Sequence, residues 1–263
     1  SPLRYPGGKS RAVKHILPHF PEDVTEVCSP FLGGGSVELA LAEKGVWVYG
    51  YDTFEPLMWF WRALLGNPDA LANEADLLRK YKDYYYGYRG LPKEDFNLIK
   101  EELRNEEKYS LQNAAKFYAL NRSSFSGATL SGGWSKRASY ERFTDSSITR
   151  IREFSEPKLY VAAQHFKHSI PAHPKTFLYL DPPYLLGKDR ENLYGDAGNK
   201  HKGFDHAGLV NILKERDNWI LSYNNCPEIL KLYEGYDIIY PDWKYGMSSN
   251  KDSKEVLIIN KKG

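Results

Sequence analysis

Residues 26–52 read EVCSPFLGGGSVELALAEKGVWVYGYD, and this sequence is the most informative about the fold. Residues 26–28 have the pattern of a short buried strand, and a glycine-rich turn follows at residues 30–36, here called the glycine turn. A helix is predicted next, and then a second strand that ends at Asp52. This order is typical of a nucleotide-type cofactor site, because glycines let the backbone approach a ligand closely.

The acidic residue at the end of the second strand supports a cofactor site. Asp52 follows Gly33 by 19 positions (52 − 33 = 19), close to the spacing of about 20 residues at which a carboxylate binds ribose hydroxyls. A glycine triplet alone more often marks only a tight turn. Together with the acid, it predicts that Gly33, Gly35, Ser36 and Asp52 bind a cofactor. A dehydrogenase uses a similar turn, so this stretch leaves the type of cofactor open.

A second informative stretch is the Pro-Pro turn, Asp181-Pro182-Pro183-Tyr184, which follows an apolar run at residues 176–180. Prolines lack an N–H and cannot continue a sheet ladder, so the predicted strand must end in a stiff turn. Two interpretations stay open from these residues. The turn is either a simple strand terminator, or a site where Asp181 and a proline carbonyl hold an amine whose ring stacks on Tyr184.

The order of predicted elements indicates a doubly wound, mostly parallel α/β sheet with helices on both faces and an antiparallel end. Its further strands are predicted at residues 159–163, 176–180, 219–222, 236–240 and 255–260. Residues 55–155 interrupt the alternation and are mainly helical, which predicts an inserted domain between two parts of a catalytic domain, residues 1–54 and 156–263. Ligands bind such sheets at the carboxyl ends of strands, where the glycine turn and the Pro-Pro turn would meet.

Residues 121–147 differ from the chain around them, being rich in Gly and Ser with no helical or strand period. From Lys116 to Arg152, seven positive and two negative side chains give +5 (7 − 2 = 5), whereas the whole chain carries only +2. Basic, hydroxyl and amide side chains on an adaptable backbone suit duplex DNA, and a solvated surface loop is the alternative. The candidate DNA-binding residues are Asn121, Arg122, Ser126, Lys136, Arg137 and Arg142.

Composition describes an ordinary globular protein, 41% hydrophobic and 27% charged. No apolar run reaches the roughly 20 residues of a membrane helix, so we expect a cytoplasmic protein without a membrane partner. Two cysteines, Cys28 and Cys226, are too few for a disulfide framework. The histidines lack partners at metal-ligand spacing, and no metal site is predicted.

Three motifs in order resemble the alpha group of DNA adenine-N6 methyltransferases, the Dam type. They are the glycine turn, the Pro-Pro turn and the N-terminal run Tyr5-Pro6-Gly7-Gly8-Lys9. The resemblance extends over nearly the whole chain, and it implies the fold of S-adenosylmethionine-dependent methyltransferases. It also implies that S-adenosyl-L-methionine is the cofactor and that the methyl group goes to N6 of an adenine flipped out of double-stranded DNA. The inserted region would then read the target sequence.

The resemblance implies roles for individual residues. The Pro-Pro turn, with Asp181, Pro182, Pro183 and Tyr184, would be catalytic. Cofactor contacts would come from Tyr5, Gly8, Lys9, Asp52 and Asp181, with Phe31 and Phe166 enclosing the adenosine. Tyr5 stands where the family commonly has tryptophan. Residues 128–134 depart from the hairpin of enzymes that read GATC, which argues against that target.

The chemistry expected at the Pro-Pro turn is methyl transfer to an amine. The exocyclic amine of adenine is a poor nucleophile, because its lone pair is delocalised into the ring. Asp181 and the Pro182 carbonyl would accept hydrogen bonds from the two N–H groups and so aim the lone pair at the methyl group. A cytosine-N4 methyltransferase and a catalytically silent DNA-binding protein remain alternatives. The expected partners are double-stranded DNA and a cognate restriction endonuclease, with the enzyme reading DNA as a monomer.

Overall fold

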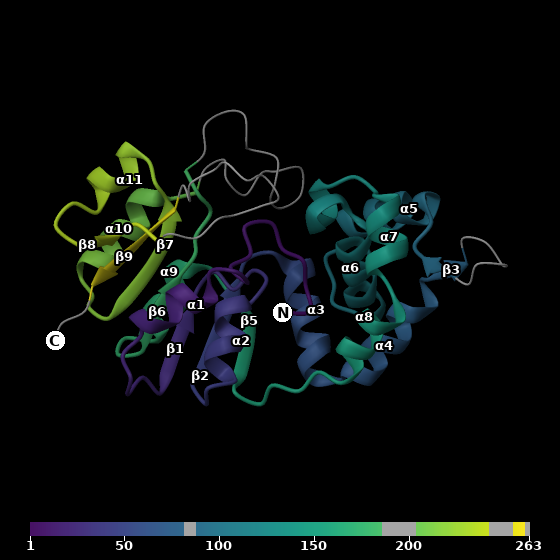
Figure 1. The fold of residues 1–263 in the computed structure, drawn as a ribbon, viewed down its shortest axis with the longest axis horizontal. Coiled ribbons are helices and arrows are strands. Elements are labelled where there is room, and N and C mark those ends of the chain that lie inside the picture. The colour runs from purple at the N-terminus through teal and green to yellow at the C-terminus, as the bar shows by residue number, and fades with distance from the viewer. Residues whose placement is uncertain (82–87, 186–203, 242–254, 261–263) are drawn as a thin grey trace. The chain divides into compact units, whose positions relative to one another are not determined.

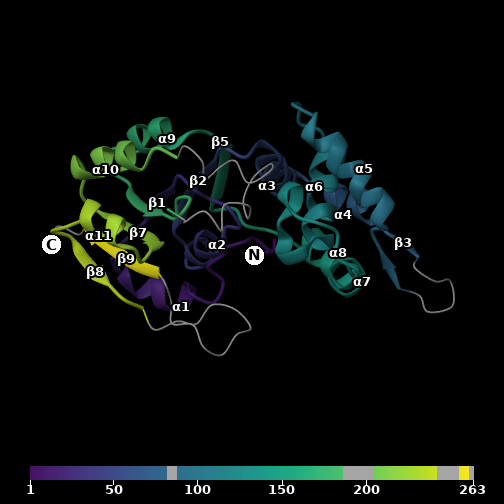
Figure 2. The same ribbon diagram turned by 90° about the horizontal axis from the view of Figure 1, so that it is seen from above.

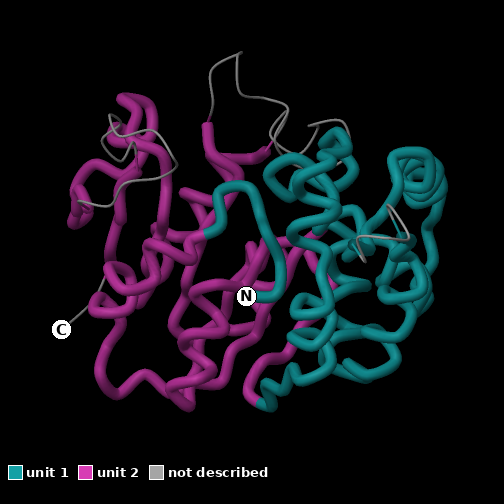
Figure 3. The backbone as a smooth tube through the Cα atoms, turned by 45° about the vertical axis from the view of Figure 1, so that its right-hand side comes forward, with its two compact units in different colours: residues 1–8, 54–157, 190–202 teal, residues 9–53, 158–189, 203–263 magenta. Residues whose placement is uncertain are grey.

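The computed structural model describes residues 1–81, 88–185, 204–241 and 255–260. The chain divides into two compact units, coloured in Figure 3. Unit 1 comprises residues 1–8, 54–157 and 190–202, and unit 2 comprises residues 9–53, 158–189 and 203–263. Within the described ranges, no helix is both long and apolar enough to cross a membrane.

Unit 2 is built on a seven-stranded sheet among its described residues, in the order β5-β2-β1-β6-β7-β9-β8 (Figure 1). The first five strands in this order are parallel, and β9 is antiparallel to both β7 and β8. The mostly parallel α/β sheet with an antiparallel end is therefore confirmed. The strands are β1 (Glu26–Ser29), β2 (Trp47–Asp52), β5 (Leu159–Ala163), β6 (Phe177–Leu180), β7 (Trp219–Asn224), β8 (Asp237–Ile239) and β9 (Glu255–Asn260).

The helices of unit 2 are α1 (Val13–Ile16), α2 (Ser36–Ala42), α9 (Phe166–Ala172), α10 (His206–Lys214) and α11 (Pro227–Leu232). Figure 2 shows α9 and α10 on one face of the sheet and α1 on the other. The first helix, α1, is short and passes into the 3-10 turn η1 (Leu17–His19), because Pro18 lacks a backbone donor. Sequence reasoning missed α9, whose helical pattern is interrupted by Pro171.

The strand order reverses between β1 and β6. From β1 the chain adds β2 and then β5 on one side, and it later places β6 and β7 on the other side. Ligands of doubly wound sheets bind outside the carboxyl ends of the strands at such a reversal. The glycine turn follows β1 and the Pro-Pro turn follows β6, so the fold brings the two motifs to the same place.

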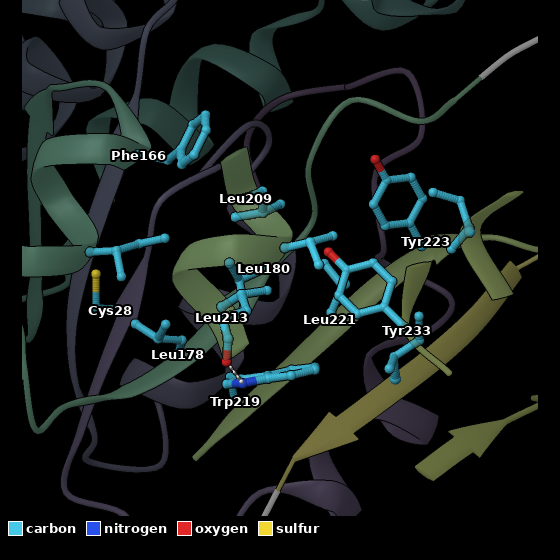
Figure 4. Packing of buried hydrophobic residues seen from close by; sticks show 14 of the residues in the cluster. Cys28, Phe166, Leu178, Leu180, Leu209, Leu213, Trp219, Leu221, Tyr223 and Tyr233 are labelled. Carbon is cyan, nitrogen blue, oxygen red and sulfur yellow. Dashed lines mark hydrogen bonds between the residues drawn. The ribbon is translucent and has the colours of Figure 1, made fainter. Parts of the chain in front are cut away.

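A cluster of buried apolar side chains packs around β7 and the neighbouring strands (Figure 4). Trp219, at the start of β7, is fully buried and donates its indole N–H to the carbonyl oxygens of Leu213 (3.2 Å) and Arg216 (3.0 Å). The first five residues of β7 are all buried, as expected for a strand covered on both faces. Each large side chain buried here contributes about 1.5–3 kcal/mol, so the carboxyl end of β7 is a rigid platform.

Unit 1 is mainly helical and is organised around α6 (Leu111–Ser123). The side chain of Ser110 caps α6 by accepting a hydrogen bond from the N–H of Asn113 (3.0 Å). Its Tyr118 is buried and stacks on Phe60, with ring centroids 5.5 Å apart. The other elements are α3 (Glu55–Gly66), α4 (Pro68–Leu77), β3 (Lys80–Tyr81), β4 (Arg89–Gly90), α5 (Lys93–Arg104), α7 (Lys136–Arg142) and α8 (Asp145–Arg152).

One local prediction in unit 1 was wrong, and one short strand pairing was not predicted. Helix α4 ends at Leu77, and beyond it Lys80–Tyr81 pairs with Arg89–Gly90. Residues 121–147, expected to be irregular, contain the 3-10 turns η2 (Phe125–Gly127) and η3 (Thr129–Ser131) and the helix α7. The signal for α7 was its cap, since Ser135 accepts a hydrogen bond from the N–H of Ala138 (3.2 Å).

Candidate active site

A buried lysine forms hydrogen bonds with the first and the last residue of the Pro-Pro turn. The Nζ of Lys9 donates to Oδ1 of Asp181 at 2.8 Å and to Oη of Tyr184 at 2.7 Å. Glu255 of β9 places Oε1 at 3.8 Å from the same nitrogen. The side chain of Lys9 is only 4% exposed and that of Asp181 is 22% exposed. The structure thus brings together Lys9, Asp181 and Tyr184, which the sequence offered in separate motifs.

The charge of Asp181 depends on its neighbour. Burial raises the pKa of Asp181 above its ordinary value, and the charge and hydrogen bond of Lys9 oppose that rise. Even a partly buried carboxylate is costly unless it is paired and hydrogen-bonded. Lys9 therefore helps to keep Asp181 ionised, which is the form that accepts hydrogen bonds.

A second buried carboxyl lies close to this pair and was missed by sequence reasoning. Oε1 of Glu38, in the first turn of α2, accepts a hydrogen bond from Oγ of Ser29 at 2.6 Å, and both side chains are buried. Burial raises the pKa of Glu38 to about 7, and the negative charge of Asp181 adds to the rise. No signal marked Glu38, because an acidic residue in the first turn of a helix is ordinarily exposed there and favoured by the helix dipole.

The glycine turn brings its backbone to the carboxylate predicted from the spacing. The N–H of Gly33 donates to Oδ2 of Asp52 at 3.1 Å. Gly33 has φ of 48° and Gly35, which precedes α2, has φ of 64°, values that side chains rarely adopt. Ser36 is the first residue of α2. A carboxylate, an open backbone turn and a helix N-terminus are the groups that a nucleoside with a charged tail requires.

Three phenylalanines form an aromatic triangle in unit 2. The rings of Phe31 and Phe166 lie with centroids 5.7 Å apart. Phe204 completes the triangle at 5.7 Å from Phe31 and 5.4 Å from Phe166. Phe31 and Phe166 were predicted to act together, and the structure brings them together. Phe204 was missed, although it directly precedes Asp205, the N-cap of α10.

Tyr5 and Gly8 lie in unit 1, next to the chain boundary with unit 2. They form a tight turn, in which the N–H of Gly8 donates to the carbonyl of Tyr5 at 2.9 Å. A Cβ at Gly8 would lie 2.9 Å from that carbonyl oxygen, so glycine is needed for the chain to turn towards Lys9. Their predicted cofactor contacts stay predictions.

Asn121 has an internal structural role within unit 1. It is fully buried, its Nδ2 donates to the carbonyls of Arg4 (2.6 Å) and Gly127 (3.2 Å), and its Oδ1 accepts from the N–H of Arg4 (3.0 Å). Gly127 has φ of 75°, and a Cβ there would lie 2.1 Å from the Arg4 carbonyl oxygen. The amide therefore clamps the N-terminal segment onto residues 121–127. Its polar atoms are used in this clamp, and its predicted contact with DNA stays a prediction.

Arg4, Arg122 and Arg142 form an arginine cluster within unit 1. Arg122 donates through Nε (3.0 Å) and Nη2 (2.6 Å) to the carbonyl of Arg142, so its guanidinium supports the end of α7. Burial lowers the pKa of Arg4, and the charges of Arg142 and Arg122 lower it further. Among the described residues, no carboxylate pairs with any of these three guanidiniums. Crowded cations without an acid favour a bound anion such as a phosphate.

The other predicted DNA-binding residues lie on the surface of unit 1. Lys136 and Arg137 are exposed on α7, and Arg137 pairs with Glu141 of the same helix at 2.8 Å. Ser126 is exposed on η2 with φ of 54°. Its neighbour Phe125 is 71% exposed, yet its backbone N–H is held by the carbonyl of Gly133 at 3.0 Å. Sequence reasoning missed this exposed aromatic ring on a strained turn, a combination that points to function.

This chain is similar to known methyltransferases. Residues 5–247 match the family of D12 class N6 adenine-specific DNA methyltransferases. A curated relative is the Type II methyltransferase M1.LlaDCHI of Lactococcus lactis subsp. cremoris. It is 23% identical over 282 residues, which cover 98% of this chain and 94% of the relative. The family match includes the glycine turn, the Pro-Pro turn and most of the arginine cluster.

Proposed function

The chain belongs to the D12 class of N6 adenine-specific DNA methyltransferases, and from this membership we propose that it methylates a flipped-out adenine within a specific double-stranded sequence, using S-adenosyl-L-methionine. Methylation of adenine in DNA is the activity of the family. The observation that carries the finer proposal is the Lys9–Asp181–Tyr184 arrangement at the carboxyl end of β6. It lies beside the glycine turn, where the strand order reverses.

The residues present suit the cofactor. Asp52 would accept hydrogen bonds from the ribose hydroxyls, while Phe31 and Phe166 would pack against the adenine ring and Phe204 would extend that apolar wall. Gly33, Gly35 and Ser36 offer backbone at the start of α2. When bound, S-adenosyl-L-methionine supplies an electrophilic methyl group on a positively charged sulfur. Lys9 and the Asp181 carboxylate are proposed to be part of the same cofactor site.

The Pro-Pro turn positions and activates the amine. Asp181 and the carbonyl of Pro182 accept hydrogen bonds from the two N–H groups of the target amine, which turns its lone pair out of conjugation with the ring. Tyr184 stacks on the base. Lys9 holds the Asp181 carboxylate and the Tyr184 hydroxyl before substrate arrives, so little reorganisation remains at the moment of reaction.

We propose that residues 55–155 are the target-recognition domain and that Arg4 acts with it. The arginine cluster binds backbone phosphates, because its charges are crowded and lack a described acidic partner. Phe125 stacks on bases next to the flipped adenine, since a large exposed ring held on a fixed backbone is suited to fill a gap in the base stack. Ser126, Lys136 and Arg137 supply further DNA contacts.

We also propose a partner, an oligomeric state and a location for this chain. The relative's name, Type II methyltransferase, supports a restriction endonuclease with the same target as a partner of this chain. The protein is proposed to act as a monomer in the cytoplasm, where DNA is available. Size-exclusion chromatography with and without a short duplex tests the monomer.

Substitution of Asp181 tests the proposed mechanism. Asp181→Ala removes one preorganised acceptor, which costs about 3 kcal/mol of transition-state stabilisation, or a hundredfold or more in rate. The measurement is single-turnover methyl transfer from a labelled donor, with Asp237→Ala as control, because Asp237 is an exposed aspartate on β8. A rate for Asp181→Ala within threefold of the control removes the catalytic role from this turn.

A further inference from the structure

The last three residues of β7 each hold one residue of the segment that carries the Pro-Pro turn. Asn224 accepts from the N–H of Leu185 at 3.1 Å and donates to its carbonyl at 2.7 Å. Tyr223 donates its hydroxyl to the carbonyl of Pro183 at 3.3 Å. Ser222 places Oγ at 3.4 Å from the hydroxyl of Tyr184. Side chains at the carboxyl end of the buried strand β7 therefore form hydrogen bonds with consecutive residues of the Pro-Pro turn segment.

The Pro-Pro turn needs donors from elsewhere, because Pro182 and Pro183 have no N–H groups. Its backbone can be fixed only through its carbonyl oxygens and through its flanking residues. Tyr223 and Asn224 supply side-chain donors at those points. These two side chains thus compensate for the backbone N–H groups that Pro182 and Pro183 lack.

Tyr223 contacts the turn with both its ring and its hydroxyl. It is 1% exposed, and its ring stacks on that of Tyr184 with centroids 5.8 Å apart and planes 23° apart. Burial raises the pKa of Tyr223, so the hydroxyl keeps its proton. The same oxygen bonds to Nδ1 of His206, the first residue of α10. The Tyr223 hydroxyl has one proton, which it donates to the carbonyl of Pro183. In its other hydrogen bond the hydroxyl oxygen must therefore accept, so Nδ1 of His206 carries a proton.

We propose that Tyr223 and Asn224 are positioning residues for methyl transfer, which fix the height and tilt of the Pro-Pro turn relative to the sheet. The stacked ring of Tyr223 supports the ring of Tyr184. The hydroxyl of Tyr223 fixes the peptide group between Pro183 and Tyr184. Asn224 holds the chain where it leaves the turn. This inference rests on the proposed catalytic role of Asp181. Displacement by about 1 Å at such a site costs about a hundredfold in rate.

The direct test is Tyr223→Phe, which removes the hydroxyl and keeps the stacked ring. We expect the single-turnover rate of methyl transfer to fall about tenfold, while the Kd for S-adenosylhomocysteine stays within twofold. The matched control is Tyr233→Phe. Tyr233 is equally buried in the same cluster (Figure 4), and its hydroxyl has no hydrogen-bond partner among the described residues. Tyr233→Phe should keep the wild-type rate.

A second variant, Asn224→Asp, keeps the acceptor for the Leu185 N–H and loses the donor to the Leu185 carbonyl. It should also lower the rate without changing the Kd for S-adenosylhomocysteine, and it carries the test if Tyr223→Phe does not fold. Wild-type rates for folded Tyr223→Phe or for Asn224→Asp overturn the inference. So do equal losses of rate for Tyr223→Phe and Tyr233→Phe that follow their losses in Tm.

Asp181→Ala, measured in parallel, separates this inference from the proposed function. If Asp181→Ala is inactive and the Tyr223 and Asn224 variants are fully active, the turn is catalytic but is not positioned by β7. If Asp181→Ala is itself active, the proposed function fails first.

Discussion

A single buried ammonium organises the charges of the candidate site. Lys9 contacts Asp181 and Tyr184 directly and lies 3.8 Å from Glu255, while Glu38 is close enough for the charges of Lys9 and Asp181 to shift its pKa. Removing one partner of a buried pair usually costs more than the pair contributes, because it leaves an uncompensated charge. The charge states of Asp181 and Glu38 should therefore affect both stability and activity.

Glu38 predicts a specific dependence of stability on pH. Its pKa rises from 4.5 to about 7 on folding, so between these values the native state binds the proton that the unfolded state has lost. The free energy of unfolding should consequently fall as pH rises through this window, by about 3 kcal/mol from this group. Glu38→Gln keeps an acceptor for Ser29 and removes the titration. Urea denaturation at pH 5 and pH 8 should show a smaller fall for the variant, and an equal fall in both proteins would refute this role.

Asp52 predicts a loss confined to cofactor binding. Asp52→Ala should weaken the affinity for S-adenosylhomocysteine about tenfold, as expected for removing a charged hydrogen-bond acceptor. Affinity for duplex DNA should not change. Calorimetry measures the first and fluorescence anisotropy the second. An unchanged Kd for S-adenosylhomocysteine would rule out the ribose contact.

Among the secondary-structure elements, the strands were predictable from sequence. The side-chain contacts between residues far apart in the sequence were not. The strand expected at residues 159–163 is β5, and the one expected at residues 176–180 contains β6, because short buried strands are apolar runs bounded by turn residues. The burial of Asn121 was hidden, since it depends on Arg4, 117 positions away. The pair of Lys9 and Asp181 is separated by 172 positions and arises only in the fold. Local patterns carry no information on such contacts.

The arginine cluster predicts how DNA binding depends on salt. Arg4→Ala and Arg142→Ala should each weaken binding to all sequences and reduce the slope of log Kd against log salt by about one unit. Arg152→Ala removes the same charge from unit 1, but Arg152 already pairs with Asp69 and Asn73, so its slope should match the wild type. Equal slopes for Arg4→Ala and Arg152→Ala would contradict a phosphate site at the cluster.

At the scale of the whole molecule, the two units carry different parts of the proposed reaction. Unit 2 contains the glycine turn, the Pro-Pro turn and the aromatic triangle, whereas unit 1 contains the arginine cluster and Phe125. The sheet belongs to a fold class that serves many reactions, so its chemistry depends on the residues placed at the strand ends. Family membership identifies adenine as the target, and the residues of unit 1 are proposed to select the sequence around it.

We propose that Asp181 directs methylation of adenine at one specific DNA sequence. The most direct measurement is sequencing, with detection of modified bases, of DNA from cells that express either the wild-type chain or Asp181→Ala. We expect N6-methyladenine within one sequence context for the wild type and its near absence for the variant. N4-methylcytosine in place of N6-methyladenine, or the same adenine methylation from both proteins, would contradict it.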